Sequence, residues 1–183
     1  MADWQLLAGA NGRYQLDNGI KGAGRLCVPA IIGKAGLIAA NAKREGDMAT
    51  PVGRWALRHL YYRQDVLGKL SFALPSTPIT RKCGWCDDPS SPHYNQYVKL
   101  KFDGSAETMW REDGAYDLVV ILGYNDAPPI AGRGSAIFLH CISRGKTVTA
   151  GCVALARDDL LRYLEGASVG QFLLIPDLPI IGG

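Results

Sequence analysis

Apolar residues are concentrated in short runs along the chain, and turn residues separate these runs. The clearest run lies within 116–124 (YDLVVILGY), where consecutive apolar residues predict a strand that is buried on both faces. Shorter runs predict further strands at 13–16, 26–32, 55–62, 97–102, 136–141 and 171–175. The 22 glycines fit the many turns that such a chain requires. The pattern therefore favours a mainly β fold.

One short helix is predicted at 157–165 (RDDLLRYLE). Two acidic residues stand near its start, where they complement the helix dipole, and Gly166 follows its last residue. Leu160, Leu161 and Leu164 fall on one face at helical spacing. We expect these three leucines to form the buried stripe of the helix.

Residues 74–95 contain four prolines and show no convincing period. A loop of this length in a compact domain is usually functional or disordered. Its aromatic residues Trp85 and Tyr94, and the acids Asp87 and Asp88, argue against disorder. We interpret the segment as an ordered lid or capping loop that forms a wall of a substrate site.

Two segments carry candidate chemistry. His140 ends the apolar run SAIFLH, and Cys152 follows a glycine in TAGCV at 149–153. A thiol becomes a strong nucleophile as a thiolate, and a nearby imidazole promotes that change. A hairpin or a strand–loop–strand unit would bring the two residues together. Strand alternation directs Cys141 away from His140, which leaves Cys152 as the partner. The pair predicts a cysteine acyltransferase or hydrolase.

Composition narrows the class of protein. The chain has 183 residues, of which 48% are hydrophobic, and this suits a single domain over 1–183 with a substantial core. Its net charge of +3 is scattered, so we expect no nucleic-acid partner. No apolar run reaches the length of a membrane helix, and no signal peptide is visible. We expect a monomer that uses no metal and no cofactor.

The cysteines leave one alternative open. Five is an odd number, so at least one thiol is free unless it pairs between chains. The motif CGWC at 83–86 has the spacing of a redox pair or of half a zinc site. The chain has no second motif of this kind to complete a zinc site. A coincidence of loop sequence is the simpler interpretation.

Three separated segments together resemble a known family. They are TAGC at 149–152 preceded by His140, GDMATPVG at 46–53, and GSAIFLH at 134–140. In this combination the chain resembles the L,D-transpeptidase catalytic domain (YkuD-type) family of bacterial cell-wall enzymes. The similarity extends over about 40–176, which is most of the chain.

Further segments refine this resemblance. WCDDP at 85–89, with YN at 94–95 and again at 124–125, resembles a compact proteobacterial branch of the family. The chain also departs from the family pattern. Ala150 stands where many members have histidine or arginine, and Ala154 stands where many have arginine or asparagine. These differences concern the handling of substrate rather than the thiol chemistry.

The resemblance implies a YkuD-type β-sandwich and a cysteine-dependent transpeptidase that forms peptide crosslinks, 3→3 or 1→3, through a thioester acyl-enzyme. It implies that Cys152 is the nucleophile, that His140 is the general base and acid, and that the Gly151 backbone serves an oxyanion hole. The implied partners are donor and acceptor stem peptides of peptidoglycan, with reactivity toward carbapenems. The implied setting is the periplasm or cell envelope, with roles in cell wall biogenesis and cell shape.

A set of polar and aromatic residues near these segments is expected to bind substrate. They are Trp85, Asp87, Asp88, Tyr94, Tyr124, Asn125, Arg133, Thr149 and Ser135. Arg133, with Arg144 and Lys146, would bind substrate carboxylates, and arginine is the better bidentate partner. Asp87 and Asp88 would hold the amino end of diaminopimelate.

Structural interpretations compete with these assignments. Asp87 and Asp88 precede a proline, which is first a turn signal, and Tyr124 with Asn125 fits the end of a strand. Arg133 between two glycines fits a solvated loop. The group that orients His140 is open: Ser143 or a backbone carbonyl of the 141–149 loop would serve.

Three rival functions remain. The nearest is an L,D-carboxypeptidase or endopeptidase on the same fold, which would hydrolyse the thioester. The second is a wall-binding module without catalysis. The third is a metal or redox protein built on Cys83 and Cys86.

Overall fold

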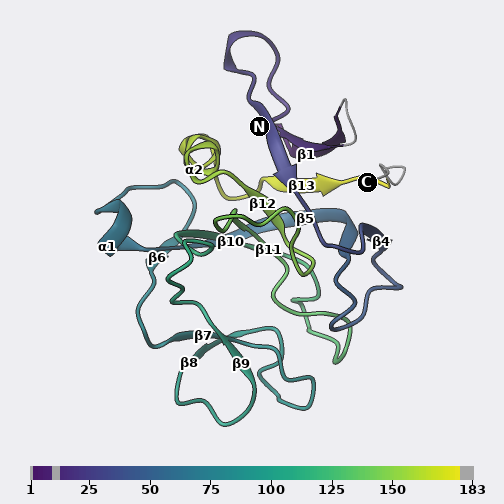
Figure 1. The fold of residues 1–183 in the computed structure, drawn as a ribbon, viewed down its shortest axis with the longest axis vertical. Helices are drawn as coiled ribbons and strands as arrows, with labels where there is room; N and C mark the ends of the chain where they lie inside the picture. The colour runs from purple at the N-terminus through teal and green to yellow at the C-terminus, as the bar shows by residue number, and fades with distance from the viewer. Residues whose placement is uncertain (1, 10–12, 178–183) are drawn as a thin grey trace.

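The structure is a computed structural model that describes residues 2–9 and 13–177. It is mainly β, as the apolar pattern predicts, and Figure 1 shows the strands gathered around one helix, α2. The strands that build the large sheet are β1 (Trp4–Ala8), β2 (Tyr14–Asp17), β3 (Cys27–Ile31), β4 (Leu37–Ala39), β5 (Thr50–Tyr62), β6 (Ser76–Pro78), β10 (Leu118–Leu122), β11 (Phe138–Cys141), β12 (Val153–Leu155) and β13 (Phe172–Ile175). The remaining elements are η2 (Gly22–Gly24), α1 (Gln64–Leu67), β7 (Cys83–Cys86), β8 (Tyr97–Lys99), β9 (Ala106–Thr108) and α2 (Arg157–Glu165).

The long strand β5 closes the large sheet on itself. Hydrogen-bonded neighbours run in the order β10-β11-β12-β3-β2-β1-β13-β5. Residues 53–56 of β5 pair with β13, and residues 57–62 pair antiparallel with β10. Because β5 reaches both ends of this series, the sheet becomes a closed sandwich rather than an open sheet. The predicted β-sandwich is therefore confirmed.

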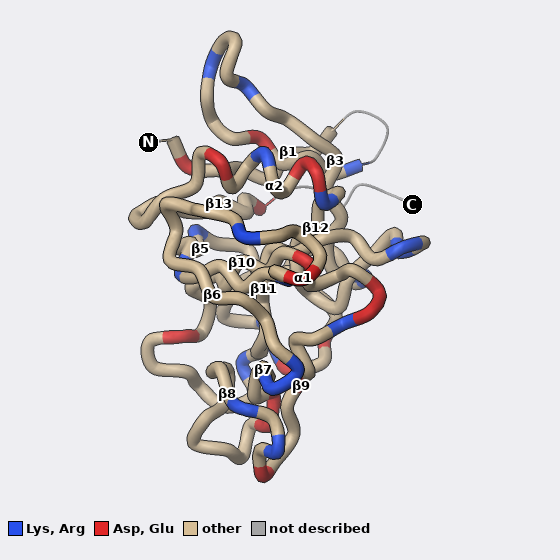
Figure 2. Tube along the Cα trace, turned by 90° about the vertical axis from the view of Figure 1, so that its left-hand side faces the viewer, with Lys and Arg blue, Asp and Glu red and all other residues tan. Residues whose placement is uncertain are grey.

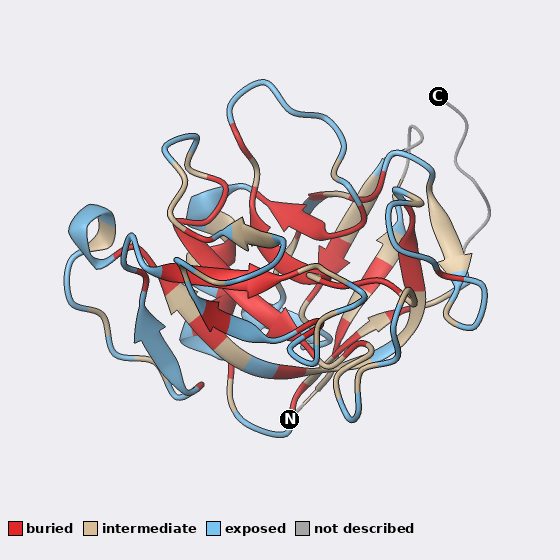
Figure 3. Cartoon of the chain, turned by 90° about the horizontal axis from the view of Figure 1, so that it is seen from below, coloured by how far each residue is buried: buried red, intermediate tan, exposed pale blue. Residues whose placement is uncertain are grey.

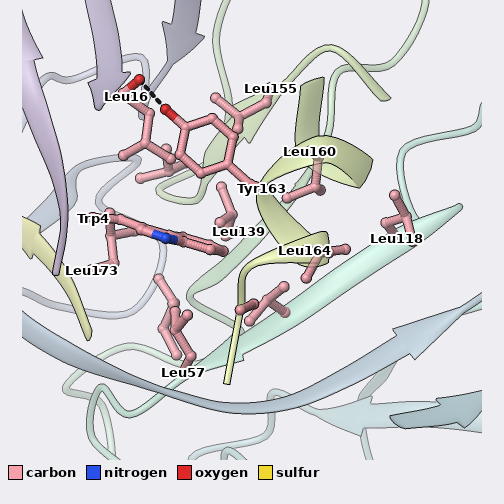
Figure 4. Close-up of a cluster of buried hydrophobic side chains, with 14 of the residues drawn as sticks. Trp4, Leu16, Leu57, Leu118, Leu139, Leu155, Leu160, Tyr163, Leu164 and Leu173 are labelled. Carbon is pink, nitrogen blue, oxygen red and sulfur yellow. Dashed lines mark hydrogen bonds between the residues drawn. The ribbon is translucent and has the colours of Figure 1, made fainter. Parts of the chain in front are cut away.

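The main core fills the inside of this closed sheet. Leucines from facing strands and from α2 are completely or almost completely buried there, and Figure 3 shows the buried strands inside a shell of exposed loops. Trp4 packs edge-on against Tyr163 of α2, with ring centroids 5.0 Å apart. The Tyr163 hydroxyl donates a hydrogen bond to the Leu16 carbonyl, as drawn in Figure 4. Helix α2 is thus held in place by the burial of its apolar side chains and by the hydrogen bond of Tyr163.

A second, smaller sheet in the order β8-β7-β9 covers the outer face of β10 and β11. In Figure 1 it lies at the end of the molecule opposite to α2. Trp85 of β7 packs edge-on against Phe138 of β11, with ring centroids 5.1 Å apart. Strand β10 is buried throughout because the main core lies on one of its faces and this layer on the other. That double burial explains the continuous apolar run at 118–122.

Predicted and observed elements differ where the pattern is weak. The helix prediction matches α2 at both ends, but Tyr163 is buried and Leu161 is only half-buried. The segment 74–95 contains two strands, β6 and β7, that were not predicted. The predicted strand at 136–141 begins at Phe138, because Ala136 has a φ of 52° and so leaves the extended region.

Candidate active site

Cys152 and His140 lie on adjacent parallel strands. In the register of β11 and β12, Leu139 is opposite Val153 and His140 is opposite Ala154. Cys152 therefore lies beside Phe138, on the face of the sheet that also carries His140. Both residues line one cavity of about 450 Å³. A strand–loop–strand unit, not a hairpin, brings them together.

Cys141 lies on the other face of β11. Its side chain belongs to the main core together with Leu139, and burial raises the pKa of its thiol to about 12. The alternation along the strand thus separates Cys141 from His140, as the sequence predicts.

The turn before Cys152 requires glycine at position 151. Gly151 has a φ of +139°, and a Cβ there would lie 2.9 Å from the Ala49 carbonyl oxygen. The Thr149 hydroxyl accepts a hydrogen bond from the Gly151 N–H at 3.1 Å and donates one to the Cys152 carbonyl at 2.7 Å. These contacts fix the turn. They also give Thr149 a structural role in addition to its place on the cavity wall.

The Cys152 thiol is protonated at neutral pH. It donates a hydrogen bond to the Ala136 carbonyl at 3.1 Å, and its sulfur accepts one from the Phe138 N–H at 3.4 Å. Burial raises the pKa of Cys152 to about 12. The Phe138 N–H acts in the opposite direction, because it stabilises negative charge on the sulfur.

His140 is neutral as well. Its Nδ1 lies 2.7 Å from the carbonyl oxygen of Cys141, so Nδ1 carries the proton and Nε2 is the basic atom. Burial lowers the pKa of His140 to about 4. The orienting group is therefore a backbone carbonyl. Ser143 instead donates to Asp113 at 3.2 Å. Within the described residues no hydrogen bond joins His140 to Cys152.

Asn95 binds the backbone N–H of Ala136, the residue whose carbonyl accepts the hydrogen bond of the Cys152 thiol. Its Oδ1 accepts hydrogen bonds from the Ala136 N–H at 3.0 Å and from the Trp85 indole at 2.9 Å. Its Nδ2 donates to the carbonyls of Tyr124 and Asn125. Asn95 is buried, and its four partners join the second sheet to the loops around the cavity. Sequence reasoning assigned no role to this residue, because its partners are distant in the chain.

Charged side chains line the cavity that holds Cys152 and His140. They include Lys43, Glu45, Asp87, Glu107 and Arg111. Figure 2 shows acidic and basic residues interspersed along the chain rather than gathered in one block. Apart from Asp87, sequence reasoning missed this charged set, because pairing of distant strands and loops brings it together and no local motif marks it.

The predicted substrate-binding residues divide into two groups. Ser135, Thr149 and Asp87 line the cavity, and so does Lys146, one of the three cations expected to bind substrate carboxylates. The others are absent from its lining and take part in hydrogen bonds that hold the surrounding loops: Trp85, Asp88, Tyr94, Tyr124, Asn125 and Arg133.

Loop contacts account for this second group. The Tyr124 hydroxyl donates to the Arg133 carbonyl at 2.5 Å, and Asn125 donates to the Gly134 carbonyl at 2.9 Å. The Asp88 carboxylate accepts the N–H of Ser90 at 2.9 Å, which is the turn that its proline-flanked position indicates.

Tyr94 and Glu45 connect the two sides of the cavity. The Tyr94 hydroxyl donates to the Glu45 carboxylate and accepts the Gly134 N–H at 3.0 Å. Ser135 donates to the same Glu45 oxygen at 2.8 Å.

The GDMATPVG segment at 46–53 contacts the turn that precedes Cys152. The Asp47 carboxylate accepts hydrogen bonds from Lys43 at 2.5 Å and from the Ala49 N–H at 2.9 Å. Thr50 accepts the Gly33 N–H and donates to the Cys152 carbonyl at 3.4 Å. This segment therefore contributes to the site by holding the backbone around Cys152 in place.

Cys83 and Cys86 are both free and buried. They are separated by three positions in β7, so their side chains leave opposite faces of the strand. Cys83 accepts hydrogen bonds from Thr80 and Tyr97. Such an arrangement does not suit a disulfide or a shared metal ion.

The fold and the site define a β-sandwich domain with a cysteine–histidine pair in a charged cavity. The sequence model of YkuD, the L,D-transpeptidase catalytic domain, matches residues 14–175. The chain belongs to this family. The match begins well before residue 40 and so includes β2 and β3, which the motif resemblance did not reach.

Some solved structures with similar chains carry the name L,D-transpeptidase. One from Mycobacterium smegmatis is 14% identical with a TM-score of 0.41, over 95% of this chain and 58% of that one. L,D-transpeptidase 3 from Mycobacterium tuberculosis, solved with a faropenem-derived adduct, is 14% identical with a TM-score of 0.41, over 95% and 60%. The chain thus spans less than two thirds of either protein. A comparison with curated proteins finds no match. None of the described helices is long and apolar enough to cross a membrane.

Proposed function

We propose that this domain is a cysteine-dependent peptidoglycan L,D-transpeptidase that crosslinks stem peptides through a thioester. The observation that supports this most directly is the placement of Cys152 and His140 on one face of adjacent strands, at a single cavity, in a chain of this family. The family's action on peptidoglycan supports a setting in the cell envelope, and roles in cell wall biogenesis and cell shape are part of the proposal.

In the first step Cys152 attacks a carbonyl of the donor stem peptide. A neutral thiol and a neutral imidazole require that the proton moves to His140 Nε2 as the C–S bond forms. The thiol must therefore turn from the Ala136 carbonyl toward the imidazole. The Phe138 N–H, 3.4 Å from the sulfur, stabilises the charge that develops there. His140 then gives the proton to the leaving amine as the C–N bond breaks.

The developing oxyanion needs N–H donors, and we assign Gly151 to this role. Its N–H would exchange the Thr149 hydroxyl, at 3.1 Å, for the oxyanion. Ser135, Thr149, Asp87 and Lys146 are the predicted substrate-binding residues that line the cavity, and we propose that these four contact the stem peptides.

In the second step the amine of an acceptor stem attacks the thioester. His140 accepts the amine proton, the C–N bond forms, and the C–S bond breaks to return the thiol. The product is a 3→3 or a 1→3 crosslink according to which donor carbonyl is attacked. Water in place of the amine would give the L,D-carboxypeptidase or endopeptidase reaction.

Acylation is the first experiment. The protein is incubated with a carbapenem and its intact mass is measured. We expect one adduct on Cys152, none on Cys152→Ala, and a normal adduct on Cys141→Ala, whose thiol faces the main core. A wild-type protein that gains no adduct would support the non-catalytic module and contradict the proposal.

Product analysis is the second experiment. Isolated disaccharide-peptides are incubated with the wild type and with Cys152→Ala, and the products are resolved by mass spectrometry. Dimers are expected from the wild type alone. Trimmed monomers in place of dimers would assign the protein to the hydrolases, and equal crosslinking by Cys152→Ala would refute the cysteine mechanism.

A further inference from the structure

The imidazole of His140 is held at one nitrogen by a hydrogen bond to the Cys141 carbonyl, at 2.7 Å from Nδ1. One such bond restrains a single ring atom, and the ring remains free to tilt about it. The other nitrogen, Nε2, must receive the Cys152 proton in the proposed reaction. A tilt that moves Nε2 by about 1 Å costs on the order of a hundredfold in rate. A base of this kind therefore needs a second contact that fixes its tilt.

Tyr116 supplies a second contact. Its ring packs edge-on against His140, with ring centroids 5.3 Å apart, and also edge-on against Phe138, with centroids 6.1 Å apart. Phe138 and His140 are alternate residues of β11, so they share the face of the strand beside Cys152. The Phe138 N–H bonds the Cys152 sulfur at 3.4 Å. One buried ring thus packs against the proposed base and against the residue that bonds the thiol.

The Tyr116 ring is itself held by two further contacts. Its hydroxyl donates to Glu107 of β9 at 2.7 Å, and the Arg111 guanidinium lies over the ring, 5.1 Å from its centroid. Two hydrogen bonds to Asp113, at 3.0 and 2.5 Å, hold Arg111 in turn. Burial raises the pKa of Tyr116 well above its usual value, so the hydroxyl keeps its proton and remains a donor.

Backbone bonds join the segment that carries Tyr116 to β11. The Ala115 carbonyl accepts the Cys141 N–H at 3.0 Å, and the Asp113 carboxylate accepts the Ala115 N–H at 3.1 Å. The backbone beside Tyr116 and the backbone beside His140 are thus tied to each other. The contact between the two rings is therefore part of the fold and does not depend on mobile side chains.

We propose that Tyr116 is a positioning residue for His140, and this inference rests on the proposed function. The Tyr116 ring fixes the tilt of the imidazole and so the location of Nε2, and the Tyr116 hydroxyl ties the ring to the second sheet. Because the hydroxyl proton is committed to Glu107, Tyr116 acts through His140 and takes no part in the proton transfer.

Three variants separate the ring from the hydroxyl and from general packing. Tyr116→Phe keeps the ring and loses the bond to Glu107, whereas Tyr116→Leu loses both. Tyr116→Met fills the volume with a flexible apolar chain and serves in place of Tyr116→Leu if that variant does not fold. The matched control is Tyr61→Leu, because Tyr61 packs against the same apolar cluster but stacks on Tyr97 instead of contacting His140.

Carbapenem acylation is measured as a maximum rate and a half-saturating concentration, on protein shown to be folded by circular dichroism. We expect Tyr116→Leu to lower the maximum rate by about thirtyfold to a hundredfold, because a displaced base slows the proton transfer. The half-saturating concentration should stay within about threefold of wild type, because carbapenem binding is unchanged. Tyr116→Phe should keep the maximum rate within about fivefold of wild type, and Tyr61→Leu within about twofold.

The pH dependence of acylation is a readout that a loss of stability alone does not move. Burial lowers the pKa of His140 to about 4, Arg111 lowers it further, and Asp113 raises it. The neighbouring Cys152 and Tyr116 are neutral at these pH values, because burial raises the pKa of each. The other charged residues that line the cavity are Lys43, Glu45, Asp87, Glu107 and Lys146.

Neutral His140 is the active base, so the acylation rate falls as the pH drops through the His140 pKa. Tyr116→Leu opens the imidazole to water and should move this decline upward, from about pH 4 toward the usual value of 6.5. Tyr116→Phe should leave it near pH 4. Both variants remove the hydrogen bond to Glu107, so an effect of Glu107 titration would appear in both.

Two failures are distinct. If wild-type protein is acylated, but folded Tyr116→Leu or Tyr116→Met keeps the wild-type rate and pH dependence, Tyr116 does not position His140 and the proposed function stands. Equal losses in Tyr116→Phe and the variants without a ring would also refute the role of the ring. If wild-type protein is not acylated at all, the proposed function itself fails.

Discussion

At the scale of single residues, the proposed catalytic pair is notable for being uncharged. Burial raises the pKa of Cys152 to about 12 and lowers that of His140 to about 4, so the thiol and the imidazole coexist in neutral form. Many reactive cysteines rely on a depressed thiol pKa instead. In the proposed reaction the thiol proton must move to His140 during the attack. The position of Nε2, set by the bond from Nδ1 to the Cys141 carbonyl, therefore decides reactivity.

The buried His140 predicts an acid-sensitive fold. Its folded pKa lies below its usual value of 6.5, so the unfolded chain binds the proton more tightly. Stability is therefore full above about pH 6.5 and declines as the pH falls toward 4. Between about pH 7.5 and pH 4.5 we expect a loss of about 2 kcal/mol from this residue, measured by urea unfolding.

Two variants separate the contribution of His140 to this pH dependence from those of other titratable residues. The lowered pKa of His59 has the same sign, whereas the raised pKa of Glu107 acts in the opposite direction. His140→Gln should flatten the decline, and His59→Gln should change it much less. Equal slopes for the wild type and His140→Gln would show that His140 is not buried in the neutral form.

Gly151 supports a second prediction at this scale. Alanine at this position would meet the Ala49 carbonyl oxygen at 2.9 Å and would have to adopt a φ of +139°. We expect Gly151→Ala to cost about 1–3 kcal/mol of stability and to slow carbapenem acylation of Cys152 by more than about tenfold. Gly170→Ala, at a positive φ with open space around its Cβ, is the control that carries backbone strain only. Unchanged acylation of Gly151→Ala would disprove the steric argument.

At the scale of elements, the sequence predicts those segments whose environment is uniform along their length. Strand β10 is buried on both faces, and α2 has clear signals at both ends, so local pattern was sufficient for both. Strands β6 and β7 are short, and irregular loops separate each of them from the strands with which it pairs. Only tertiary pairing defines them, and no local periodicity is available to predict them.

The residues of the site likewise divide into those that the sequence predicts and those that only tertiary pairing brings to the cavity. Cys152 and His140 stand in recognisable motifs, and alternation along one strand was enough to exclude Cys141. Glu107 and Arg111 reach the cavity only because β9 pairs with β7. Their sequence neighbourhood contains nothing that marks a site.

Substitution of Asn95 tests how the second sheet supports the proposed catalytic thiol. Removing its amide leaves the buried Ala136 N–H and the Trp85 indole without their acceptor. We expect Asn95→Ala to cost about 2–4 kcal/mol of unfolding free energy. The exposed Asn41→Ala should cost less than about 0.5 kcal/mol.

A functional readout distinguishes this role from general stabilisation. Asn95 binds the N–H of Ala136, the residue whose carbonyl accepts the hydrogen bond of the Cys152 thiol, so Asn95→Ala should also alter the rate at which iodoacetamide modifies Cys152 under native conditions. A variant that is destabilised but keeps the wild-type rate of modification would limit Asn95 to a structural role.

At the scale of the whole molecule, closure of the sheet couples the site to the fold. Strand β5 pairs with β13 and with β10, and its first residue, Thr50, donates a hydrogen bond to the Cys152 carbonyl. The catalytic strands β11 and β12 lie within the same closed series. Neither half of the sandwich has a complete set of partners without β5. We therefore expect the described fold to unfold in a single cooperative transition.

Leu60 in β5 tests this coupling. It is completely buried and pairs with Val120, so Leu60→Ala should lower the free energy of unfolding by about 2–5 kcal/mol through the cavity that it leaves. Circular dichroism and exposure of the Cys152 thiol, followed in the same urea titration, should shift together to a lower midpoint. Val66→Ala, at an exposed position in α1, should leave both midpoints near the wild-type values. If the thiol became exposed well before the β signal was lost, the catalytic strands would form a separate unit and the closed sheet would not be one cooperative structure.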